Sequence, residues 1–269
     1  MTERRGMSRY GAQAMTMARK GLRFLVAAMA AALCLTPCAA AGEPVALELV
    51  LAVDTSASVD PEEFDLQVKG IADAFAHPEV IAAVESLGGM GMAVTVVQWS
   101  APESSGPVLA FSHVYDRRTS KAFGFLVGLT HRRSTTGTTA IGNAVELSAG
   151  LIDGNGFDGD RRVIDVSGDG RNNTPPDIES VRDRAVVRGF TINGLAILSD
   201  DPRLDAYYQS SVIGGRDAFV EVATGYDEFA QAIRRKLIRE IYPPLSQGKG
   251  RQTFGLNAPK AKLPLRSAY

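Results

Sequence analysis

The chain has 269 residues, of which 45% are hydrophobic and 22% charged, and its formal net charge is -1. This length and composition suffice for one large hydrophobic core, and they exclude a disordered chain, a collagen and a strongly basic nucleic-acid-binding protein. There are only 2 cysteines, Cys34 and Cys38. A metal site built on thiolates is therefore not expected.

The first 41 residues have the pattern of an export signal. Basic residues up to Arg23 precede a short apolar run that ends at Leu35, and an A-x-A motif follows at 39–41. The apolar run is shorter than the roughly 20 residues that a membrane-spanning helix needs. We therefore expect residues 1–41 to be a cleaved signal peptide, with a periplasmic or secreted protein and no stable membrane anchor afterwards. The true start of this leader stays open between the first methionine and later ones.

A strand and a helix are predicted at the start of the mature chain. Val45 to Val53 form an almost continuous apolar run, which is typical of a strand buried on both faces of a parallel sheet. This run ends at Asp54. After a short loop, Asp60 can cap a helix that has Pro61 at its first position. Strand, loop and helix make the first unit of the fold.

The same alternation continues along the chain. Further strands are predicted at 92–99, 108–114, 163–166, 191–198 and 219–223, and further helices at 119–130, 141–152, 177–188 and 227–241. This pattern predicts an α/β fold, with a doubly wound, mostly parallel sheet of about six strands and helices on both faces. We assign residues 42–242 to this one domain. Residues 243–269, which contain basic but no acidic side chains, are expected to form a flexible basic tail.

Side-chain oxygens stand at three places where predicted strands end or a helix begins. Asp54, Ser56 and Ser58 form a D-x-S-x-S motif directly after the first strand. Thr139 precedes the third predicted helix, and Asp169 follows the fourth predicted strand. Because ligands of such sheets bind at the carboxyl ends of the strands, we expect these oxygens to lie at one edge. Hard oxygen ligands suit Mg²⁺, Mn²⁺ or Ca²⁺.

Together these motifs resemble the metal-ion-dependent adhesion site of the von Willebrand factor type A family, over about residues 45–241. In that family a D-x-S-x-S motif, a Thr from a later loop and an Asp after the fourth core strand surround a divalent ion. The matching positions in this chain are Asp54, Ser56, Ser58, Thr139 and Asp169. The export signal and the Val-Ile-Asp-Val-Ser-Gly-Asp-Gly run look like a bacterial group of secreted A-domain proteins with no assigned function.

The resemblance implies binding without catalysis. Protein oxygens, some acting through water, would hold Mg²⁺, or Mn²⁺ or Ca²⁺, with one open coordination position. A carboxylate of a protein partner would complete the shell. Since only Asp54 and Asp169 would bring formal negative charge to the ion, it would stay electrophilic enough to attract that acid. We therefore expect an exported, metal-dependent protein-binding module that does not bind nucleic acid.

Basic residues are expected to flank the loops near the ion: Arg117, Arg118, His131, Arg132 and Arg133. Such residues can form a solvated basic rim around the site. Alternatively, the arginines contact an acidic partner and steer it toward the metal, which would make the association rate depend on salt.

Two other functions stay open. Residues 168–173, Gly-Asp-Gly-Arg-Asn-Asn, resemble the G-D-G-x-N-D signature of haloacid-dehalogenase-type phosphatases. In that reading Asp54 would accept the phosphoryl group and Asp169 would bind Mg²⁺. The chain departs from the phosphatase pattern because Ser56 stands where the proton-donating Asp is expected, and Asn173 replaces the last Asp. The other reading is a metal-free structural protein of the cell envelope.

Overall fold

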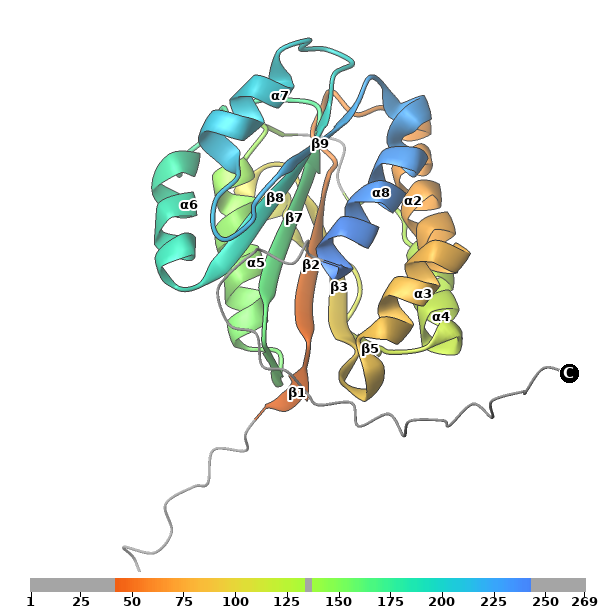
Figure 1. The fold of residues 1–269 in the computed structure, drawn as a ribbon. Helices are drawn as coiled ribbons and strands as arrows, with labels where there is room; N and C mark the ends of the chain where they lie inside the picture. Colours follow the sequence, from red (N-terminus) through yellow and green to blue (C-terminus); the bar gives the residue numbers. More distant parts are fainter. Residues whose placement is uncertain (1–41, 134–136, 243–269) are drawn as a thin grey trace, which may run out of the picture. The chain divides into compact units, whose positions relative to one another are not determined.

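The computed structural model describes residues 42–133 and 137–242. This part of the chain is built around a seven-stranded sheet with helices on both faces (Figure 1). The predicted α/β class and the mostly parallel, doubly wound sheet are confirmed. The predicted signal peptide, residues 1–41, and the predicted tail, residues 243–269, lie outside the described residues.

The strand order of the large sheet is β4-β3-β2-β7-β8-β9, and β5 also pairs with β3. The parallel strands are β2 (Leu47–Asp54), β3 (Met92–Trp99), β7 (Arg162–Gly168), β8 (Phe190–Ile197) and β9 (Val220–Ala223). A separate parallel pair joins β1 (Glu43–Val45) to β6 (Phe157–Gly159).

The predicted strand at 108–114 is instead two short strands, β4 (Gly106–Pro107) and β5 (Ser112–Val114). Both run antiparallel to β3, as a hairpin partner would. Pro107 has no backbone N–H to donate, so it cannot continue a ladder of hydrogen bonds. The split explains why the sheet has one strand more than the sequence pattern indicates.

The central strands are buried on both faces. Every residue of β2 and of β3 is buried. Glu48 is the one charged residue in the interior of β2, and its carboxylate accepts hydrogen bonds from Asn155 Nδ2 at 2.6 Å and from Gly159 N at 2.8 Å. Glu48, which interrupts the first apolar run, thus has hydrogen-bond donors for its buried carboxylate from the segment that carries β6.

Four helices cover one face of the sheet: α2 (Pro61–Ala76), α3 (Pro78–Ser86), α4 (Arg117–Gly128) and α8 (Phe229–Ile241). The other face packs against α5 (Ile141–Asp153), α6 (Ile178–Val187), α7 (Leu204–Tyr207) and the π-helical turn η3 (Tyr208–Val212). Short 3₁₀ turns occur at η1 (Gly88–Met90), η2 (Pro102–Ser104) and η4 (Tyr226–Glu228).

The first helix begins as predicted. Asp60 accepts a hydrogen bond from Glu63 N, the Glu63 carboxylate accepts one from Asp60 N, and Pro61 occupies the first helical position. This reciprocal capping box fixes the start of α2 at Pro61, and therefore the end of the loop after β2. Within the described ranges, none of the helices is both long and apolar enough to span a bilayer.

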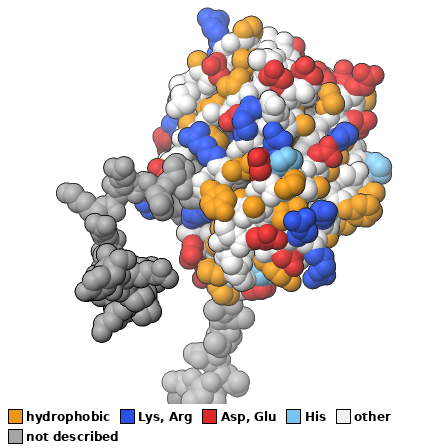
Figure 2. All heavy atoms as spheres, turned by 45° about the vertical axis from the view of Figure 1, so that its right-hand side comes forward, with side chains coloured by type: hydrophobic (Ala, Val, Ile, Leu, Met, Phe, Trp, Pro, Cys, Tyr) orange, Lys and Arg blue, Asp and Glu red, His pale blue; other side chains and the backbone are white. Residues whose placement is uncertain are grey.

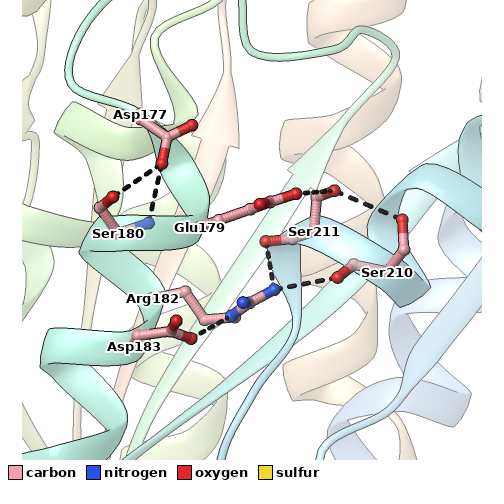
Figure 3. A network of polar contacts seen from close by, with 7 residues as sticks. All are labelled: Asp177, Glu179, Ser180, Arg182, Asp183, Ser210 and Ser211. Carbon is pink, nitrogen blue, oxygen red and sulfur yellow. Dashed lines mark hydrogen bonds and ion pairs between the residues drawn. The ribbon is translucent and has the colours of Figure 1, made fainter.

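The segment η3 is anchored to α6 by a polar network (Figure 3). Arg182 Nη1 donates to the carbonyl oxygens of Ser210 and Ser211 at 2.9 Å each. The Ser211 hydroxyl donates to Glu179 Oε1 at 2.8 Å, and Asp177 caps α6 through Ser180 N. The network holds η3 against the sheet, and η3 in turn carries Tyr208 toward the end of β7.

Candidate metal centre

The loop after β2 bends sharply at the carboxyl edge of the sheet, the upper edge in Figure 1. Thr55 donates to the carbonyl oxygen of Trp99 through both its N–H, at 2.8 Å, and its hydroxyl, at 3.1 Å. Ser56 N donates to Asp54 Oδ1 at 2.7 Å, and Gln67 Nε2 donates to the Asp54 carbonyl oxygen. These bonds hold Asp54 and Ser56 in place, and both side chains are buried.

Arg132 closes the same loop from the outside. Its Nη2 donates to the carbonyl oxygens of Thr55, Ser56 and Val59. One guanidinium nitrogen thus donates to three carbonyl groups between residues 55 and 59, in the loop that carries the D-x-S-x-S motif. Arg132 therefore shapes the loop.

The loop after β7 brings Asp169 to the D-x-S-x-S segment. Ser58 Oγ donates to Asp169 Oδ1 at 2.8 Å, and Ser56 Oγ lies 3.2 Å from Ser58 Oγ. The other carboxylate oxygen, Asp169 Oδ2, accepts a hydrogen bond from the Tyr226 hydroxyl at 3.0 Å. Ser58 and Asp169 are 111 positions apart in the chain, so only the sheet topology joins them.

Thr139 adjoins this group through the residue that follows Asp169. A Cβ placed on Gly170 would lie 3.4 Å from Thr139 Oγ1. Thr139 itself is only 8% exposed, whereas Thr138 is exposed. The structure therefore places Thr139 beside the loop that carries Asp169, and Thr139 is the buried one of the two adjacent threonines.

The spacing of these oxygens fits a small hard dication. In an octahedral shell with bonds of about 2.1 Å, neighbouring ligand oxygens lie about 3 Å apart. The hydrogen-bonded separations of 3.2 Å between the two serine hydroxyls and 2.8 Å between Ser58 and Asp169 are compatible with that value, although ordinary hydrogen bonds have the same lengths. Among the described residues, no group of three or more His, Cys, Asp or Glu side chains is placed to hold a metal ion.

The electrostatics of the two carboxyl groups also favour a cation. Burial raises the pKa of Asp54 to about 7, and the neighbouring Asp169 carboxylate adds to the rise. Burial likewise raises the pKa of Asp169 above its usual value. Asp54 Oδ2 is buried and has no hydrogen-bond partner within the described part of the chain. A dication, or water bound to it, would stabilise both ionised carboxylates.

The floor of the centre contains residues that were not predicted from the sequence. A Cβ on Gly168 would lie 2.7 Å from Asp54 Oδ2, 3.0 Å from the Tyr208 hydroxyl and 3.1 Å from Trp99 Cζ2. Tyr208 and Tyr226 carried no signal in the sequence, because their roles depend on contacts with distant strands.

The prediction that Arg117 and Arg118 flank the ion is wrong. They open α4, just after β5, and Val114 of β5 pairs with Met92 at the amino end of β3. The candidate centre lies beyond Trp99 at the other end of that strand, about 23 Å away along the strand. The hairpin reverses the chain direction, so residues that follow it emerge at the opposite edge.

Arg133 lies beside β3 and β4, and both its backbone and its side chain make hydrogen bonds to these strands. Its backbone N–H donates to Gln98 Oε1 at 2.8 Å, and its Nη1 donates to the Pro107 carbonyl oxygen at 3.0 Å. Acidic groups are among the neighbours of Asp169. Burial and the Asp200 carboxylate raise the pKa of Asp169. Asp169 also contributes to the raised pKa of Glu63, after burial and Asp60. Within the described part of the chain, the four predicted arginines thus do not form a rim of free basic side chains around this centre.

The fold is that of a von Willebrand factor type A domain, and solved structures of that class match it. The structure of proximal thread matrix protein 1 from the mussel byssus with a zinc-occupied MIDAS motif matches with a TM-score of 0.52 and 15% identity, covering 73% of this chain and 48% of that one. The von Willebrand factor type A protein from Catenulispora acidiphila matches with a TM-score of 0.50 and 18% identity, covering 73% and 43%.

The vWF domain of the type V pili tip protein Mfa5 from Porphyromonas gingivalis matches with a TM-score of 0.50 and 10% identity, covering 78% of this chain and 99% of that one. This chain spans about half the length of the mussel and Catenulispora chains. A family model described as "Protein of unknown function (DUF1194)" matches residues 44–245, and the chain belongs to this family. No curated protein sequence matches it.

Proposed function

We propose that this protein is an exported, non-catalytic module that binds a protein partner through a divalent metal ion. The observation that carries the proposal is the convergence of Asp54, Ser56, Ser58, Thr139 and Asp169 at one sheet edge, with a buried carboxylate oxygen that has no partner among the described residues. The zinc-occupied MIDAS motif of the mussel protein supports the view that this fold can hold a divalent ion.

At the proposed metal centre, the serine and threonine residues and the aspartates would have different roles. Ser56, Ser58 and Thr139 would contribute neutral hydroxyl oxygens, and the two aspartates would balance the charge. When bound, Mg²⁺, or Mn²⁺ or Ca²⁺, supplies a coordination position that a partner's carboxylate can fill. Because the protein brings only two formal negative charges, a third carboxylate from outside remains favourable.

The geometry gives the phosphatase alternative no support. Ser56 occupies the position of the proton donor, and its N–H is bonded to Asp54 Oδ1. Asn173, which replaces the last acid of the phosphatase signature, bonds to the backbone of Thr139.

Export is proposed from the leader sequence, and it agrees with the byssus and pilus-tip origins of two structural neighbours. A periplasmic or secreted domain would meet free Mg²⁺ and Ca²⁺ as well as surface proteins of other cells or of the envelope. This location suits a binding module whose partner is another protein.

Metal binding can be tested by thermal unfolding of the full chain in EDTA and in Mg²⁺ or Mn²⁺. An ion that binds only the folded state at 100 times its Kd adds about 2.7 kcal/mol to the free energy of unfolding. We expect the melting temperature to rise by about 5 °C or more with metal. Asp54→Ala and Asp169→Ala should abolish the rise, and wild-type protein that shows no rise with any of the ions would refute the proposal.

A further inference from the structure

The loop after β7 carries two adjacent asparagines, and their side chains bind the backbone just before α5 and in its first turn. Asn173 Oδ1 accepts a hydrogen bond from Thr139 N at 2.9 Å, and Asn173 N donates to the Thr139 carbonyl oxygen at 3.0 Å. The backbone of Thr139 is therefore held on both sides by one residue. This residue lies four positions after Asp169, in the same loop.

Asn172 binds the first turn of α5 and not Thr139. Its Oδ1 accepts from Gly142 N at 3.0 Å, in the first turn of α5, where the N-cap residue Ala140 has no side-chain acceptor of its own. Its Nδ2 donates to the carbonyl oxygens of Thr174 and Pro176. Asn172 thus caps a helix and closes its own loop, and none of its hydrogen bonds within the described residues is to Thr139.

The two segments approach each other closely. A Cβ on Gly142 would lie 2.3 Å from the Pro176 carbonyl oxygen, so the start of α5 is pressed against the loop. Gly170, as described above, lies against the Thr139 side chain. The distance between Thr139 and Asp169 is therefore set by packing around Gly142 and Gly170 and by the paired bonds of Asn173.

We propose that Asn173 is a positioning residue of the metal centre, which fixes the Thr139 hydroxyl at the distance from Asp169 that a shared ion requires. The inference rests on the proposed metal site. Partners that orient a metal ligand without touching the metal typically contribute tenfold to a hundredfold to affinity. Asn173, which stands where the phosphatase signature has its last Asp, would thus support metal binding.

The test compares Mn²⁺ affinity, measured by calorimetry on the full chain, with the melting temperature in EDTA. Asn173→Ala should weaken Mn²⁺ binding about tenfold or more. Asn173→Asp keeps an acceptor for Thr139 N, so its affinity should stay within about threefold of wild type or exceed it. The matched control is Asn172→Ala, which should lower the metal-free melting temperature through the lost helix cap but change Mn²⁺ affinity by less than about threefold.

Three results would overturn the inference. Wild-type Mn²⁺ affinity in Asn173→Ala would leave the metal site in place and remove the proposed role of Asn173. Equal losses of affinity and of metal-free melting temperature in the two alanine variants would reduce Asn173 to general support of the loop. If wild-type protein bound no metal, the proposed function itself would fail, and the inference with it.

Discussion

At the scale of single residues, the two oxygens of the Asp54 carboxylate have different environments. Oδ1 accepts a hydrogen bond from Ser56 N, whereas Oδ2 is buried without a partner in the described ranges. A buried polar atom without a hydrogen bond costs about 1–3 kcal/mol, and more when it is charged. A bound ion would relieve this cost, so metal binding and folding stability should be coupled.

Gly168, the last residue of β7, allows Asp54 to occupy its position. A Cβ at Gly168 would lie 2.7 Å from Asp54 Oδ2 and would also contact the Trp99 ring. We expect Gly168→Ala to weaken Mn²⁺ binding about tenfold or more and to destabilise the protein by about 1–3 kcal/mol, because the buried neighbours have little room to move. Calorimetry and urea unfolding measure the two effects.

Gly150 in α5 provides the matched control. Nothing lies within 4 Å of a Cβ added there, so Gly150→Ala should raise the free energy of unfolding by up to about 1 kcal/mol through helix propensity. Mn²⁺ affinity should stay unchanged in this variant. Wild-type affinity in Gly168→Ala would instead indicate that the centre does not use Asp54.

The two neighbouring arginines should behave differently. Arg132 binds three carbonyl groups of the D-x-S-x-S loop, whereas Arg133 binds Pro107 and Gln98. Arg132→Ala is expected to weaken Mn²⁺ binding about tenfold, because the loop loses the donor that holds its carbonyl groups. Arg133→Ala should leave the affinity within about twofold of wild type. Equal effects in a Mn²⁺ titration would contradict this division.

At the scale of elements, α8 is joined to the sheet by buried charged groups. Lys236 Nζ lies 2.8 Å from Asp165 Oδ1 on β7 and 2.6 Å from Glu240 Oε1 in its own helix. Asn193 Nδ2 on β8 donates to the same Glu240 oxygen at 2.9 Å, and the Phe219 ring lies over the Lys236 ammonium group. Burial, together with the Glu240 carboxylate, raises the pKa of Asp165 to about 7.

This cluster should make metal-free stability fall with rising pH. The pKa of Asp165 is higher in the folded protein than in the unfolded chain, where it is about 3.9, so the folded state binds the additional proton. The resulting stabilisation is complete below about pH 4 and is lost as the pH rises through about 7. Urea unfolding in EDTA should therefore show a lower midpoint at about pH 8 than at about pH 5.5.

Asp54, whose pKa is also about 7, acts in the same direction. The contribution of the α8 cluster is isolated by Asp165→Asn, which cannot titrate. We expect the difference in unfolding free energy between the two pH values to be smaller in this variant. A difference equal to that of wild type would assign the pH dependence to other groups.

The elements that the sequence predicted well have long apolar runs or defined ends. β2, β3 and β8 were predicted within about two residues, and α2 was recognised from Asp60, Pro61 and Glu63. The helices α3 and α7 and the turn η3 were not predicted. Each is short, and such helices form in water only when other parts of the fold pack against them.

At the scale of the whole molecule, the described residues place acidic groups as well as arginines near the centre. Figure 2 shows acidic, basic and hydrophobic side chains mixed over the face that it presents. Arg117 and Arg118 lie at the far edge of the sheet, and the charged groups that act on Asp169 include Asp200. Attraction of an acidic partner would then come from the bound ion and not from the surface as a whole.

This distribution of charge leads to a prediction for the partner. Capture from an envelope extract on immobilised protein should retain a partner in Mg²⁺ and lose it in EDTA. Once that partner is purified, its association rate in Mg²⁺ should change by less than about tenfold between 50 and 200 mM salt, because long-range steering is weak. A steep fall of the association rate with salt would indicate that surface arginines steer the partner. Retention of the partner in EDTA would contradict a contact bridged by the metal.

The sequence by itself determined the fold class and the candidate ligands. Strand periodicity identified the parallel sheet, and the rule that ligands lie at carboxyl ends of strands placed Asp54 and Asp169 at one edge, because both features depend on local pattern and chain direction. Only the tertiary structure decided the surroundings of those ligands. Three features show this: Asn173 binds Thr139, Tyr226 binds Asp169, and Arg117 lies at the opposite edge of the sheet from the site. All three arise from contacts between segments far apart in the chain, and such contacts leave no periodic signal in the sequence.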